Sequence, residues 1–328
     1  MSNFEIITLT EEHKRSTQEL LNYYKELRSF LKEEPYQDFS EKGIHFREEL
    51  NILIKKILKI IIQYNIQIDG LDLIPNGPVI YASSHQDFYD IINSIYAYPE
   101  HILTLNASNI SRILKILLNI NGVIYVDRNN KTSRQKAKYE MSKAVLKGKS
   151  VNLYPEATWN CSPNKLHLPF YMGMIDIARI TGAPIVPVVQ EYTYDQSKLD
   201  GKSHVKSVHI RFGKPVYVSL TDDRFEKLEE FDEVFSTIKW ELLEEKGLYK
   251  REDMSNMLYV DYIKARINDW KIPRNNIYEE RKQVLFASDD FYLFHHVNDV
   301  DFDENGNLLQ TEYVRKLNKI GDMHLKRF

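Results

Sequence analysis

The sequence predicts an α/β fold, with a mixed, mostly parallel sheet flanked by helices and with helical additions at both ends of the chain. Short β-branched runs alternate with helical patterns from about residue 66 to residue 220, and this alternation is typical of parallel sheets whose strands are joined by helices. Charged, helix-prone sequence precedes this region, and further helical patterns follow it. With 43% hydrophobic residues among 328, the chain can bury a large core.

The N-terminal segment, residues 1–65, is expected to hold a charged helix ended by Pro35 and an apolar helix from about Arg47. Strands are expected at the β-branched runs bounded by Gly, Pro or Asn, namely IQIDG, PVIYASS, GVIYVDR, SVNLYPE, APIVPVVQEY and VHIRFGKPVYV. Helical periodicity covers residues 88–98, 110–118, 133–147 and 171–181. The chain therefore divides into residues 1–65, an α/β domain at 66–220, and a helical extension with a hairpin-like tail at 221–328.

Composition argues against several classes of protein. The net charge of −3 shows no basic excess, so nucleic acid is not expected as a partner. The single cysteine, Cys161, excludes an internal disulfide framework and fits a reducing cytoplasm. The N-terminus is polar and mixed in charge, unlike a secretory signal, and no run reaches the ~18 to 20 apolar residues that a spanning helix needs.

The apolar run LNILIKKILKIIIQYNIQI, residues 50–68, has two interpretations. Its lysines, Lys55, Lys56 and Lys59, would form a narrow stripe on an otherwise apolar helix. Such a helix can lie in a membrane interface with its lysines near anionic headgroups. It can equally be a buried helix that covers the sheet while its lysines reach outward to water.

His85 and Asp90, in the run SSHQDFYD, are the candidate catalytic residues. Asp87 is the expected N-cap of the following helix, so Asp90 falls in the first turn, where a carboxylate bends back toward the entering chain. That carboxylate can hold one imidazole nitrogen as N–H and leave the other as a general base. No adjacent serine is in position to act as a nucleophile, which suits deprotonation of a substrate hydroxyl. The spacing alone also fits an ordinary capping pair.

Three motifs follow this run: GVIYVDR at 122–128, YPEATWN at 154–160 and PIVPV at 184–188. Together with the H-x-x-x-x-D spacing, and in this order, they resemble the four blocks of the glycerophospholipid acyltransferases of the lysophosphatidate (PlsC-like) type. The later blocks of that family read G-x-x-F-[IV]-D-R, F-P-E-G-T-R and P-[IV]-[IV]-P-V. The resemblance covers residues 66–220 and implies the PlsC-like fold.

The resemblance also implies residue roles. His85 would be the general base and Asp90 its orienting partner, while Arg128 would contact the acceptor's phosphate, unless it serves only in a salt bridge. The third block would contribute to the acceptor site through Glu156, Ala157 and Thr158, although Glu156 also fits a buried structural carboxylate. The implied reaction moves a fatty acyl group from acyl-CoA or acyl carrier protein to a lysophospholipid-like acceptor. It needs no cofactor and would take place at the inner, cytoplasmic face of a membrane, to which the protein binds peripherally.

The sequence departs from the family at the acceptor site. Ala157 replaces a glycine, Trp159 replaces an arginine, and Asp87 stands where a small residue is common. A phosphate would therefore meet less positive charge, unless Lys165 or Arg134 compensates. The acceptor is expected to be an unusual lysophospholipid or another hydroxyl or amine carrier.

Other functions remain open from the sequence. The same His–Asp pair would serve a thioesterase that uses water, and a Cys–His acyl-enzyme with Cys161 and either His85 or His167 is a less favoured alternative. The basic stretch at 128–149 would suit an acidic acyl donor or a membrane surface.

A non-enzymatic lipid- or calcium-binding protein is a further alternative. The tail run DFDENGNLLQTE fits a calcium loop with ligands at Asp301, Asp303, Asn305 and Glu312. A hairpin turning at Asn305–Gly306 is favoured over this metal site, so no metal is expected.

Overall fold

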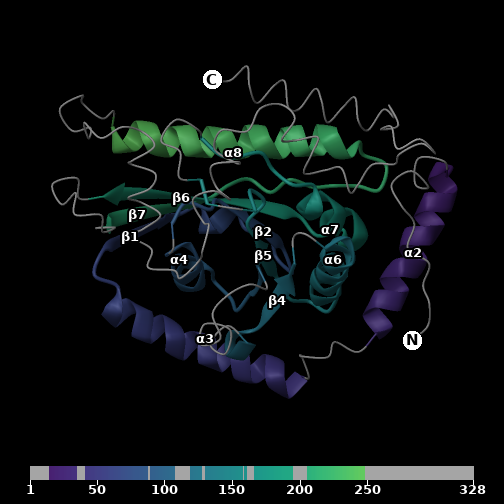
Figure 1. Cartoon of the computed structure of the whole chain (residues 1–328), viewed down its shortest axis with the longest axis horizontal. Coiled ribbons are helices and arrows are strands. Elements are labelled where there is room, and N and C mark those ends of the chain that lie inside the picture. The colour runs from purple at the N-terminus through teal and green to yellow at the C-terminus, as the bar shows by residue number, and fades with distance from the viewer. Residues whose placement is uncertain are drawn as a thin grey trace.

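The computed structural model describes residues 15–34, 41–87, 89–107, 119–127, 130–157, 159–160, 166–194 and 205–247. Its centre is a seven-stranded sheet in the order β1-β7-β6-β2-β5-β3-β4 (Figure 1). The strands are β1 (Asn65–Asp69), β2 (Ile80–Ser83), β3 (Leu103–Ala107), β4 (Val123–Val126), β5 (Val151–Leu153), β6 (Ile185–Tyr194) and β7 (Val205–Phe212). Neighbouring strands run parallel, except that β6 and β7 are antiparallel. The predicted mixed, mostly parallel sheet is confirmed.

Helices cover both faces of the sheet. The helices are α2 (Thr17–Glu33), α3 (Glu41–Ile61), α4 (Asp90–Ala97), α6 (Lys131–Leu146), α7 (Gly173–Thr181) and α8 (Arg224–Lys246), with a short 3-10 turn at Leu71–Leu73. Apolar side chains of α6, α7 and α8 pack on one face, and α4 packs on the other. Helix α3 lies outside α4, on the side of the sheet opposite α8, and α2 lies beside α6 and α7 (Figure 1).

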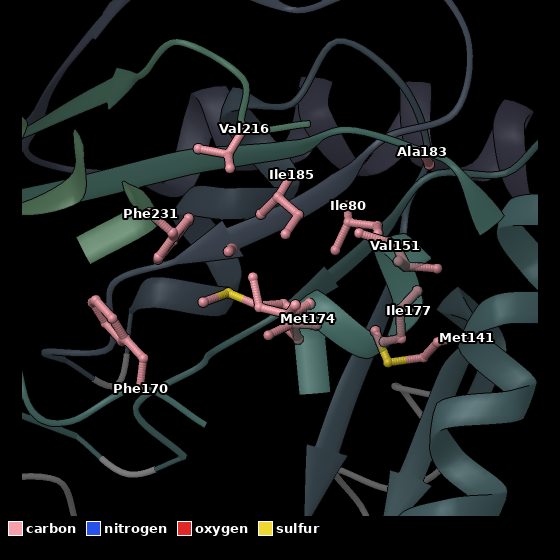
Figure 2. Packing of buried hydrophobic residues seen from close by; sticks show 14 of the residues in the cluster. Ile80, Met141, Val151, Phe170, Met174, Ile177, Ala183, Ile185, Val216 and Phe231 are labelled. Carbon is pink, nitrogen blue, oxygen red and sulfur yellow. The ribbon is translucent and has the colours of Figure 1, made fainter. Parts of the chain in front are cut away.

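The central strands are buried on both faces of the sheet, and this is why their sequences are continuous apolar runs. Along β2, Ile80 and Ala82 enter the cluster under α6, α7 and α8, while Val79 and Tyr81 enter the cluster beside α4. Figure 2 shows the first cluster, in which strand residues such as Ile80 gather with Met174 of α7. A strand that is buried on both faces has no polar face to alternate with, as is usual in parallel sheets.

Some elements differ from the expectation. Strand β3 was not predicted, because the sequence HILTLNA is short and its apolar residues are interrupted by Thr104 and Asn106. The run expected as one strand at VHIRFGKPVYV splits: β7 ends at Phe212, and beyond it Val216 makes a single antiparallel bridge to Ile185. The helix expected at 110–118 and the tail from residue 248 onward lie outside the described residues.

Helix α3 is longer than expected and does not cover the sheet. Six of its large apolar side chains are exposed to solvent: Phe46, Ile52, Leu53, Ile57, Ile60 and Ile61. The exposed fraction of Ile60 is 82%. Leu58 is buried, and Lys55 donates a hydrogen bond to the carbonyl of Tyr98 at the end of α4. The buried-helix interpretation of this segment is therefore wrong. Among the helices that the structure describes, none combines the length and the hydropathy needed to cross a membrane.

Candidate active site

The loop between β2 and α4 carries the candidate pair. His85 follows the carboxyl end of β2, and its Nδ1 lies 2.8 Å from Oδ2 of Asp90, the first residue of α4. A carboxylate can only accept hydrogen bonds, so Nδ1 carries the proton and Nε2 is the basic nitrogen. The His85 side chain is 16% exposed, whereas that of Asp90 is completely buried. A substrate can therefore reach the imidazole but not the carboxylate.

The Asp90 carboxylate bends back toward the entering chain, as the capping-box argument predicted. Its Oδ2 also accepts backbone N–H bonds from Gln86, at 2.7 Å, and from Asp87, at 2.9 Å. Helix α4 begins at Asp90, later than expected. Asp87 still makes the expected capping contact, because its Oδ1 accepts the N–H of Tyr89 at 3.2 Å. The Asp90 N–H bonds the carbonyl of Asp87, three residues back, so the chain enters the helix through a turn.

Two aromatic rings flank the His85 imidazole. Tyr154, directly after β5, stacks on it with ring centroids 4.2 Å apart and an angle of 22° between the planes. Trp159 packs against it at 5.2 Å, tilted by 51°. Burial raises the pKa of Tyr154 well above its usual value, so this phenol stays neutral. The position at which the resembling family has an arginine is thus occupied here by a buried aromatic that contacts the candidate base.

Glu156 joins two segments of the site. Its Oε1 accepts the backbone N–H of His85 at 3.0 Å, and its Oε2 accepts that of Leu168 at 2.7 Å. The side chain is buried, and burial raises its pKa to about 7. The carbonyl of His85 accepts a hydrogen bond from the N–H of Asn160. These contacts hold the backbone of His85 from both sides and give Glu156 a structural position in this site.

Ala157, next in the third block, has a φ of 54°. Left-handed backbone is disfavoured for a residue with a Cβ by about 1 to 2 kcal/mol. The turn therefore has the shape that a glycine would favour, although the sequence supplies alanine at this position.

Several predicted residues lie outside the described residues: Arg128, Thr158, Cys161, Lys165 and the calcium candidates Asp301, Asp303, Asn305 and Glu312. Of the other candidates, Arg134 lies on α6. His167 is paired with Asp232 of α8, Nε2 to Oδ1 at 2.6 Å, and it stacks on Phe170. His167 is therefore engaged in a buried ion pair.

The fold and this geometry define an α/β protein with a histidine–aspartate pair at the carboxyl edge of its parallel strands, where proteins of this class bind ligands. Residues 65–191 match the family model described as Acyltransferase.

Three relatives are named 1-acyl-sn-glycerol-3-phosphate acyltransferase. A chloroplastic one from Brassica napus is 27% identical over 164 residues, covering 48% of this chain and 47% of that protein. One from Borreliella burgdorferi is 27% identical over 156 residues, covering 47% and 59%. One from Cocos nucifera is 28% identical over 206 residues, covering 60% and 58%. The chain therefore spans about half the length of the curated relatives it matches.

Among solved structures, the 1-acyl-sn-glycerophosphate (LPA) acyltransferase PlsC from Thermotoga maritima aligns with a TM-score of 0.48. The alignment has 19% identity and covers 62% of this chain and 83% of that one. On the sequence comparisons, residues 65–191 are similar to an acyltransferase domain, and the curated proteins that the chain resembles are named 1-acyl-sn-glycerol-3-phosphate acyltransferases.

Proposed function

We propose that this protein transfers a fatty acyl group from an acyl thioester, either acyl-CoA or acyl carrier protein, to a hydroxyl of a lysophospholipid-like acceptor. The observation that carries the proposal is the 2.8 Å contact between His85 and Asp90 at the carboxyl edge of the sheet, within the matched segment 65–191. The names of the relatives support the acceptor class.

In the proposed reaction, Nε2 of His85 takes the proton of the acceptor hydroxyl while the oxygen attacks the thioester carbonyl. The new C–O bond forms and the C–S bond breaks, and the imidazolium returns the proton to the departing thiolate. Asp90 stabilises the imidazolium and fixes the ring's tautomer. Backbone N–H groups stabilise the negative charge that develops on the carbonyl oxygen.

The acceptor is expected to differ from that of typical family members. The arginine position of the third block holds Trp159, which packs on His85, and Asp87 adds a negative charge close to the pair. A phosphate on the acceptor would need its cation from Arg128, Lys165 or Arg134. A lysophospholipid with a weaker demand for positive charge, or another hydroxyl or amine carrier, fits these residues better.

Incubating the protein with acyl-CoA, or with acyl carrier protein, tests this function. With 1-acylglycerol-3-phosphate or another lysophospholipid present, mass spectrometry is expected to detect the acylated acceptor, and thiol release is expected to depend on that acceptor. Rapid thiol release without any acceptor would instead establish a thioesterase, because the same pair can activate water. Comparing lipid extracts of cells with and without the protein then identifies the natural acceptor.

We further infer that the protein acts at the cytoplasmic face of a membrane and that α3 binds this surface. On a helical projection, the exposed side chains of Phe46, Leu53, Ile57, Ile60 and Ile61 fall within an arc of about 100°. This arc is the apolar face of α3; exposed Lys56 lies about 40° beyond one edge of it, and exposed Lys59 lies about 100° beyond the same edge. Apolar side chains beside lysines suit insertion between anionic headgroups. Because the proposed substrates carry acyl chains, we expect them at the same membrane surface.

Replacing Leu53 and Ile57 with serine is expected to reduce binding to vesicles that contain phosphatidylglycerol by tenfold or more. Each substitution removes roughly 1.5 to 3 kcal/mol of apolar transfer free energy. Co-sedimentation measures the bound fraction. A matched control replaces Tyr217 and Trp240, which are 57% and 54% exposed and lie outside α3. Equal binding by both double variants would contradict the assignment of α3.

A further inference from the structure

Three side chains of β6 reach the loop that carries the proposed catalytic pair. Residues two apart on a strand share a face, and Gln190, Tyr192 and Tyr194 share the face that α4 covers. Nε2 of Gln190 donates to the carbonyl of Asp90 at 3.2 Å, and the Tyr194 hydroxyl donates to Oδ2 of Asp87 at 2.9 Å. Between them, the Tyr192 hydroxyl donates to Oδ1 of Asp90 at 2.6 Å.

The two oxygens of Asp90 have different partners. Oδ2 accepts from His85, Gln86 and Asp87, whereas among the described residues the donor to Oδ1 is Tyr192. The Tyr192 side chain is 1% exposed. Burial, and then the nearby charge of Asp90, raise its pKa well above the usual value, so the hydroxyl keeps its proton. A hydrogen bond from a neutral donor to a buried carboxylate is among the strong ones.

Two residues continue this contact away from the pair. Nδ2 of Asn93 donates to the Tyr192 oxygen at 2.8 Å, and Oδ1 of Asn93 accepts from the Tyr64 hydroxyl at 2.8 Å. The amide of Asn93 therefore has one orientation. Each O–H or N–H in the series Tyr64, Asn93, Tyr192 points toward the Asp90 carboxylate. Such aligned hydrogen bonds polarise one another.

We propose that Tyr192 is a positioning residue for the catalytic pair, and that the series Tyr64–Asn93–Tyr192 sets the orientation of Asp90 and how strongly Asp90 holds the His85 imidazole. The effect of Tyr192 on catalysis, but not its effect on the His85 imidazole, rests on the proposed function. Tyr192 and Tyr64 both lie just outside the segment 65–191 that matches the acyltransferase family.

The Tyr192 hydroxyl partly neutralises the Asp90 charge, so removing it leaves more of that charge to stabilise a protonated His85. In Tyr192→Phe, the pKa of the His85 imidazolium is therefore expected to rise. Among the described residues, the other titratable groups near the pair are the same in the wild-type protein and in Tyr192→Phe; they are Tyr64, Asp87, Tyr89, Tyr98, Tyr154, Glu156 and Tyr194.

The test follows the His85 imidazole by NMR across pH in the wild-type protein and in Tyr192→Phe, with the resonance assigned by its absence from His85→Ala. The expected result is an upward shift of the His85 titration, together with a loss of about tenfold in kcat/KM and a matching upward shift of the acid limb of the pH–rate profile. Tyr98→Phe is the matched control. Tyr98 is also a buried tyrosine at the site, but its hydroxyl bonds Ser83 and Asn152 instead of Asp90.

An unchanged His85 titration in Tyr192→Phe, or an equal shift in Tyr98→Phe, would overturn the proposal. If Tyr192→Phe does not fold, Tyr64→Phe decides, because it removes the far end of the series and should produce a smaller shift in the same direction. The NMR titration does not require turnover. A shifted titration in a protein that transfers no acyl group would refute the proposed function and leave this inference standing.

Discussion

Replacing His85 with alanine is expected to abolish acyl transfer while the protein stays folded. A positioned general base contributes about 10²- to 10⁴-fold to such a reaction, and Nε2 of His85 is the proposed base. The fold should survive because Oδ2 of Asp90 keeps its bonds from the N–H groups of Gln86 and Asp87. The backbone N–H of residue 85 also remains available to Glu156.

The measurement is acceptor-dependent thiol release, combined with thermal unfolding to verify the fold. His45→Ala is a suitable control, because His45 is an exposed histidine on α3, remote from the pair in sequence, and forms a surface ion pair with Glu49 at 3.3 Å. It should leave the rate nearly unchanged. Substantial transfer by a folded His85→Ala protein would contradict the mechanism.

Replacing Asp232 with alanine is expected to lower the free energy of unfolding by about 3 to 5 kcal/mol, the usual cost of removing one partner of a buried ion pair. Asp232 lies on α8, and both it and His167 are almost completely buried, with side-chain exposures of 6% and 5%. Ser236 also donates to Asp232. Chemical denaturation at pH 6 measures the loss. Glu230→Ala, which removes an exposed ion pair on the same helix, should cost less than about 1 kcal/mol.

The His167–Asp232 ion pair also predicts how the loss of unfolding free energy in Asp232→Ala depends on pH. Burial lowers the pKa of His167, but the hydrogen bond and charge of Asp232 outweigh burial, and the net shift is upward. A raised pKa in the folded state means that the stabilisation is fully present below the unfolded value of about 6.5. It is lost as pH rises through the folded pKa. The difference between wild type and Asp232→Ala should therefore shrink above pH 6.5, and a difference that grows with pH would contradict this assignment.

Local sequence rules predicted the parts of the site that depend on neighbouring residues. The bend of Asp90 toward His85 follows from a spacing of five residues and the chemistry of a helix start. The strands that carry the site were identifiable from β-branched runs. By contrast, the contact of Tyr192 with Asp90 spans 102 positions and depends on β6 lying beside β2. The run QEYTY at residues 190–194 is polar throughout, so it does not reveal which of its side chains face the pair.

The apolar run at 50–68 shows a second limit. Its hydrophobic periodicity predicted a helix, and the structure contains α3. Periodicity measures how apolar side chains are arranged around one helix, but not which neighbouring element covers them. Because α4 occupies the face of the sheet that α3 was thought to cover, the apolar side of α3 faces solvent.

Strand β6 makes polar contacts on both of its faces, and these contacts determine how much of the chain is needed to hold the His85–Asp90 pair. On one face Tyr192 bonds Asp90; on the other, Glu191 is paired with Lys239 and Lys246 of α8. A piece of this chain that keeps both contacts of β6 must therefore extend through α8, well past residue 191, where the match to the family model ends. The ion pairs of α8 make that helix part of the unit that holds the His85–Asp90 pair in place.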